Sequence, residues 1–108
     1  MNGIAINDPS TLRFVKRSRW SVKFEVDGKR YMLHESTEDC ETSVTLYRLF
    51  QDRSGRFDLD EIATARFDGI GVALRGAGMS EVSDATPLSQ ISKAWFLATL
   101  CAKGLVRL

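Results

Sequence analysis

The sequence predicts an α+β fold: an antiparallel sheet of three to five strands, a long C-terminal helix packed on one face, and one short helix. Three observations predict it. Apolar and polar residues alternate from Trp20 to Asp27, Thr42–Gln51 is rich in β-branched and aromatic residues, and helix start and stop signals bound Pro87–Lys103. A chain of 108 residues is long enough for one compact domain, residues 1–108, with its own core.

The strongest local signal is a β-hairpin within Trp20–His34. Apolar side chains stand at every second position from Trp20 to Val26, which is the pattern of a half-buried strand. Asp27 and Gly28 both tolerate a positive φ, so they suit a two-residue type I′ turn. This turn places four pairs opposite each other: Val26 with Lys29, Glu25 with Arg30, Phe24 with Tyr31, and Val22 with Leu33.

The middle of the chain predicts a central strand, a turn and a short helix. Thr42–Gln51 carries apolar residues on both faces, which is typical of a strand with neighbours on either side. Asp52–Gly55 has aspartate first and glycine fourth, the pattern of a type I turn. Asp58 and Glu61 are spaced as a capping box for a short helix that runs to about residue 67. Ala63–Phe67 is also compatible with a strand.

The C-terminal part predicts a helix of about seventeen residues. Thr86 can cap it and Pro87 suits its first position, where the missing N–H would have no partner within the helix. Gly104 stands where a helix commonly ends in the left-handed conformation. Leu105–Leu108 could form a short edge strand.

This helix is apolar on nearly its whole circumference. At 100° per residue, one half carries the expected core stripe: Leu88, Ile91, Ala94, Trp95, Ala98, Cys101 and Ala102. Phe96, Leu97 and Leu100 gather on the opposite half, where they form one apolar patch. Either another part of the same chain covers this patch, or it is a surface for self-association or for another protein.

The patch favours a small non-enzymatic protein-interaction module, such as a regulatory adaptor or an inhibitor. Its partner would be another protein or a second copy of the chain, joined as a homodimer through Phe96, Leu97 and Leu100. We expect neither a small-molecule substrate nor a cofactor.

A basic segment supports an alternative function, nucleic-acid binding. Its candidate residues are Arg13, Lys16, Arg17 and Arg19. Their positive charges could neutralise phosphates, although the acidic stretch Glu35–Glu41 could instead balance them within the fold. Trp20, which could stack on a base, is expected in the core because it begins the apolar face of the hairpin.

Signals for enzyme or metal chemistry are weak. His34 is the only histidine and there are two cysteines, Cys40 and Cys101, so a catalytic triad or a four-ligand zinc site lacks residues. Phe50–Glu61 resembles an EF-hand calcium loop, but phenylalanine stands where calcium needs an oxygen. The glycine-rich stretch from Gly69 to Gly78 lacks the lysine of a phosphate-binding loop.

The sequence predicts a cytoplasmic protein. No apolar stretch approaches the length of about 18 residues needed to span a membrane, and residues 1–9 lack the pattern of a signal peptide. In that compartment, Cys40 and Cys101 are expected as reduced thiols.

Overall fold

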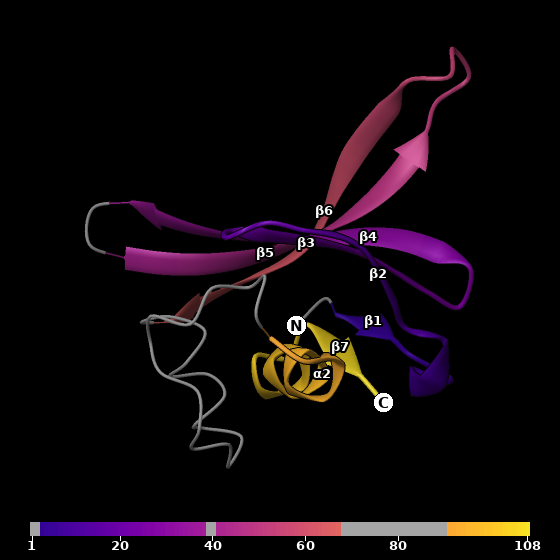
Figure 1. Cartoon of the computed structure of the whole chain (residues 1–108). Coiled ribbons are helices and arrows are strands. Elements are labelled where there is room, and N and C mark those ends of the chain that lie inside the picture. Colours follow the sequence, from indigo (N-terminus) through magenta and orange to yellow (C-terminus); the bar gives the residue numbers. More distant parts are fainter. Residues whose placement is uncertain (1–2, 39–40, 68–90) are drawn as a thin grey trace.

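The computed structural model describes residues 3–38, 41–67 and 91–108 of the chain. Its main element is a five-stranded antiparallel sheet in which consecutive strands are neighbours, in the order β2-β3-β4-β5-β6 (Figure 1). The strands are β2 (Arg13–Arg17), β3 (Ser21–Val26), β4 (Lys29–Glu38), β5 (Glu41–Gln51) and β6 (Phe57–Phe67).

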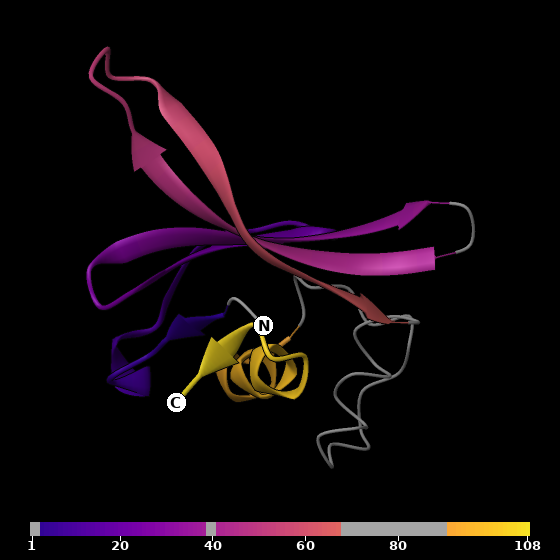
Figure 2. The ribbon, with the colours of Figure 1, turned by 180° about the vertical axis from the view of Figure 1, so that it is seen from behind.

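The smaller elements lie together on one side of this sheet, as Figures 1 and 2 show from opposite directions. They are β1 (Ile4–Ala5), the 3₁₀ helix η1 (Pro9–Thr11), the helix α2 (Lys93–Ala102) and β7 (Val106–Arg107). β1 and β7 pair in parallel, so both ends of the described chain meet beside α2. The hydrophobic core fills the space between these elements and the sheet.

The predicted hairpin is confirmed, including its register. β3 and β4 pair Val26 with Lys29 and Phe24 with Tyr31, as the turn chemistry requires. Asp27 has a φ of 53° and Gly28 a φ of 77°, the left-handed values that a type I′ turn needs. The prediction that Trp20 lies in the core is wrong, because Trp20 precedes β3 and is 51% exposed.

β5 is a central strand between β4 and β6, as predicted. The turn after it is also confirmed, because the N–H of Gly55 donates to the carbonyl of Asp52 over 3.1 Å. The short helix predicted after this turn is wrong. Asp58 and Glu61 lie in β6, which pairs with β5 from Phe57 to Phe67, and pairing along a long neighbouring strand outweighs the local capping pattern.

The predicted long C-terminal helix is also wrong. Within the described residues the fold is mostly β: a five-stranded antiparallel sheet, the small β1–β7 pair, the 3₁₀ helix η1 and one short α-helix. Ser92 caps α2, with its side chain accepting from the N–H of Trp95, so the helix has ten residues. Thr86, Pro87 and Leu88 lie outside the described residues. The predicted end is confirmed: Gly104 has a φ of 70°, and the N–H of Leu105 donates to the carbonyl of Leu100.

The face of α2 that packs on the sheet is opposite to the one predicted. Phe96 and Leu100 have no exposed surface, whereas Ala94 and Ala102 are exposed. The Phe96 ring meets the rings of Phe24 and Phe14 edge-on, with centroids 5.0 and 5.3 Å apart. The physical reason is buried area: a phenylalanine and a leucine remove more apolar surface from water than a stripe rich in alanine.

Candidate binding surfaces

The sheet has one uncovered face, which we call the open face. It lies on the side away from α2 and carries Lys23, Met32 and Leu49, which alternate along their strands with the core residues Phe24, Leu33 and Leu46. No element within the described ranges covers it (Figure 1). Any binding surface built on the sheet must therefore be built from this face and from the edges of the sheet.

A β-bulge in β2 controls which basic residues reach the open face. Phe14 pairs with Phe24, but the next pair is Lys16 with Lys23, so Val15 is an extra residue in β2. The extra residue reverses the alternation, and Lys16 stands directly opposite Lys23. Neither lysine has a hydrogen-bond or ion-pair partner among the residues that the structure describes.

The predicted basic cluster is divided between several environments. Arg13 forms an ion pair with Glu25 over 3.1 Å. Arg17 turns toward the core side, where its Nη1 donates to the carbonyl of Ile91 over 3.0 Å and its guanidinium lies over the Phe14 ring. The Arg19 guanidinium lies 5.0 Å from the centre of the Trp20 ring.

Of the four predicted residues, only Lys16 presents an unpaired charge to the open face. Its neighbour Lys23 was missed, because the alternation of β3 identifies a solvent-facing position but not which residue of β2 stands opposite.

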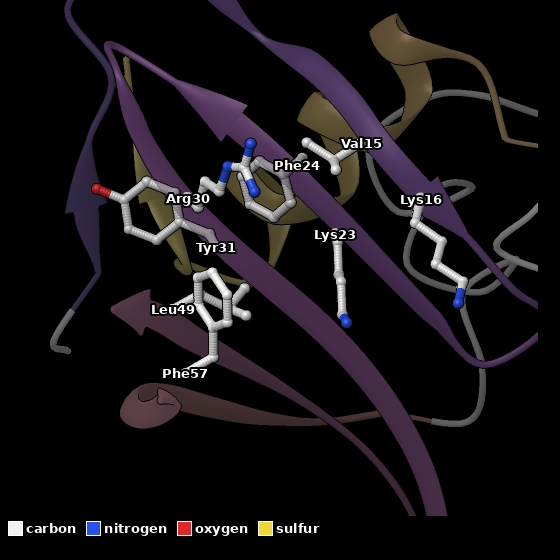
Figure 3. Close-up of a pocket in the computed structure, with 8 residues that line it drawn as sticks. All are labelled: Val15, Lys16, Lys23, Phe24, Arg30, Tyr31, Leu49 and Phe57. Carbon is white, nitrogen blue, oxygen red and sulfur yellow. The ribbon is translucent and has the colours of Figure 1, made fainter. Parts of the chain in front are cut away.

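Two adjoining hollows surround these lysines. The larger, of about 260 Å³, lies between Val15, Lys16 and Lys23 on one side and Leu49 and Phe57 on the other (Figure 3). Figure 3 shows the side chains of Lys16 and Lys23 extending in the same direction from neighbouring strands, while Leu49 and Phe57 line the other side of the hollow. The smaller hollow, of about 150 Å³, is lined by Lys16, Ser18, Ser21 and Lys23.

The end of the β5–β6 hairpin, from Phe50 to Leu59, forms a second candidate surface, which we call the arm. Figures 1 and 2 show that it leaves the sheet and projects to the side opposite α2. Pairing between β5 and β6 passes from Leu46–Ala63 to Tyr47–Glu61, so Ile62 forms a bulge, and bulges bend a strand pair.

Exposed apolar side chains concentrate on the arm. Phe57 is 66% exposed, Leu59 is 43% exposed and Phe50 is 38% exposed. The tip is well ordered by hydrogen bonds: the carboxylate of Asp52 accepts from the N–H and the hydroxyl of Ser54 and from the N–H of Arg56. The Ser54 hydroxyl is the main cause of a lowered pKa of Asp52, and the backbone N–H of Arg56 adds to it. The arm thus exposes its apolar side chains to water on two strands that are joined by a hydrogen-bonded turn.

The helix patch predicted as an associating surface is not exposed. Phe96 and Leu100 are fully buried in the core of the monomer, and Leu97 is partly buried against it. The observation that suggested association through Phe96, Leu97 and Leu100 is therefore explained by the core of the same chain.

His34 and Cys101 are the residues named above for catalytic or metal chemistry that the structure describes. His34 pairs with Ser21 at the start of β3 and lines a hollow with Trp20, Glu35 and Ser36. Residues 3–38, 41–67 and 91–108 contain no group of three or more histidine, cysteine, aspartate or glutamate side chains that could hold a metal ion. Burial raises the pKa of the Cys101 thiol, which is a free thiol.

Two predicted features lie outside the described residues, namely Cys40 and the glycine-rich stretch from Gly69 to Gly78. Within the part of the chain that the structure describes, no helix has the length and apolar character needed to cross a membrane.

Comparison with known proteins adds no identification. No protein family model matches this sequence, and neither a curated protein nor a solved structure matches it.

Proposed function

We propose that this chain is a small non-enzymatic protein-interaction module, such as a regulatory adaptor or an inhibitor, and that it self-associates through the arm. The observation that carries the proposal is the exposure of Phe57 and Leu59 on one face, and of Phe50 on the other face, of a projecting two-stranded ribbon. An isolated two-stranded hairpin is only marginally stable in water, so a ribbon with an apolar surface gains from a partner. Contiguous exposed apolar side chains are typical of interaction surfaces.

The favoured partner is a second copy of the chain. The same molecule carries both an apolar projection and, on its open face, a hollow of about 260 Å³ with Val15 and Leu49 in its lining. A two-fold dimer uses one surface twice, so each arm would lie on the open face of the other copy. Covering Phe57 and Leu59, which share one face of the ribbon and are each roughly half exposed, would contribute on the order of 1.5–3 kcal/mol per copy.

The proposal includes the cytoplasmic location expected from the sequence. The free thiol of Cys101 is compatible with a reducing compartment.

Light scattering coupled to size-exclusion chromatography tests self-association. We expect the wild-type mass to rise toward that of a dimer with increasing concentration, and the Phe57→Ser/Leu59→Ser variant to remain monomeric. Leu108→Ser is the matched control, because it removes an apolar side chain that is 72% exposed outside the arm. A wild-type chain that is monomeric at every concentration contradicts the proposal, as does a dimer that survives in the arm variant.

A further inference from the structure

We propose that the smaller hollow, lined by Lys16, Ser18, Ser21 and Lys23, binds a phosphate group of single-stranded nucleic acid, and that Trp20 stacks on a neighbouring base. This site lies outside the arm, but it shares Lys16 and Lys23 with the larger hollow on which the arm of a second copy is proposed to lie. It retains Lys16 and Arg19 from the basic cluster identified in the sequence, and it adds Lys23 on the neighbouring strand.

The first argument is the arrangement of charge. Lys16 and Lys23 occupy opposite positions on β2 and β3, and like charges directly opposite each other destabilise a sheet. Glu25, the acidic residue of the same open face of β3, is already engaged by Arg13 over 3.1 Å and lies 3.5 Å from Arg30. The two ammonium groups are therefore left unneutralised, and an anion between them would relieve their repulsion.

The second argument is how the bulge at Val15 brings the two lysines together. Under strict alternation, Lys16 would share the face of Phe14 and point toward the core, and Arg17 would point outward. The bulge exchanges these roles: Arg17 turns inward to the carbonyl of Ile91, and Lys16 joins Lys23. Bulges commonly re-aim a side chain at binding sites.

The third argument is the chemistry beside the lysines. Ser18 and Ser21 place two hydroxyl groups 2.8 Å apart at the turn between β2 and β3, in the same hollow. Trp20 belongs to this turn and is 51% exposed, with the Arg19 guanidinium over its ring. Lysines that contact phosphates beside an exposed aromatic ring on which a base can stack are the usual means of binding a single strand.

Fluorescence anisotropy with a labelled oligo-deoxythymidine tests the proposal. The Lys16→Gln/Lys23→Gln variant removes two phosphate contacts, so the slope of log K against log salt should become shallower by about 1.4. Between about 50 and 200 mM salt, the wild type should then lose about sevenfold more affinity than this variant. Trp20→Ser should weaken binding by about fivefold or more at constant salt.

The matched control is Lys29→Gln/Lys93→Gln, which removes the same charge from two exposed lysines outside the hollow. It should keep the wild-type salt slope. The Phe57→Ser/Leu59→Ser variant should bind at least as tightly as the wild type, because no arm of a second copy then competes for the hollow lined by Lys16 and Lys23. Equal losses in the two double-lysine variants would overturn the site, and so would the lack of binding at low salt. Binding of inorganic phosphate without binding of the oligonucleotide overturns the nucleic-acid assignment, as does equally tight binding of a duplex.

Discussion

Leu97 and Leu100 provide a direct test of how α2 packs. Both leucines lie on the helix face predicted to be distant from the sheet, yet Leu100 has no exposed surface and Leu97 is only partly buried. We expect Leu100→Ala to lower the free energy of unfolding by about 3–4 kcal/mol. Loss of three buried carbon atoms accounts for about 2.4 kcal/mol of transfer free energy, and the remaining cavity adds to it.

Leu97→Ala is the matched control, because it makes the same chemical change one turn away on the same helix. We expect it to cost about 1 kcal/mol, since a partly exposed side chain loses less apolar contact. Urea unfolding, followed by circular dichroism, measures both values. With an m value of about 2 kcal/mol per molar urea, Leu100→Ala should lower the midpoint by about 1.5–2 M.

A larger effect of Leu97→Ala than of Leu100→Ala would refute the assigned orientation of the helix. The comparison is informative because the total free energy of unfolding of a domain is only about 5–15 kcal/mol.

Three further predictions follow from local geometry. A Cβ added at Gly3 would lie 2.7 Å from the carbonyl oxygen of Gly104 and 2.8 Å from that of Leu105. Gly3→Ala should therefore lower the free energy of unfolding in urea by about 1–3 kcal/mol. An unchanged urea midpoint would contradict this close approach. Hydrogen bonds led by the Ser54 hydroxyl lower the pKa of Asp52 from its usual 3.8, so their contribution to stability is complete above pH 3.8 and is lost as pH falls through the lower folded-state pKa. NMR titration of the Asp52 carboxyl checks this, and a midpoint at or above 3.8 would contradict it. Burial raises the pKa of the Cys101 thiol above its usual 9.0. In a Cys40→Ser background, alkylation of Cys101 near neutral pH should therefore be slower in the folded chain than in urea. Equal alkylation rates would show that the thiol is not shielded.

The β3–β4 hairpin could be predicted in full because every local signal agreed. The Asp27–Gly28 turn fixes the register, and that register also brings Glu25 opposite Arg30 and Phe24 opposite Tyr31. The Gly104 helix end was predictable for a similar reason, since a left-handed residue after a helix is a local requirement. Because backbone and side-chain preferences agree, such elements can be predicted from the local sequence without knowledge of the rest of the chain.

β6 could not be assigned from the sequence because its local and non-local preferences disagree. Asp58 and Glu61 have helix-capping spacing, but the outer edge of β5 offers pairing from Thr42 to Gln51. Propensity is a weak guide when such pairing is available. The prediction of the packing face of α2 failed for another reason. On a helix that is apolar all round, the number of apolar residues on a face does not measure the apolar area that the face buries.

The candidate basic site shows which information the sequence of one β-strand lacks. Composition identified the charges of β2, but their directions depend on one extra residue, Val15, whose position appears only in the pairing with β3. That residue places Lys16 beside Lys23 and sends Arg17 to the core side of the sheet. The functional difference between an evenly charged connector and a paired-lysine site therefore depends on register. A variant that deletes Val15 should close the bulge, leave Lys16 directly after Phe14 and still opposite Lys23, and keep the wild-type affinity for single-stranded nucleic acid, whereas a loss of affinity would contradict this register.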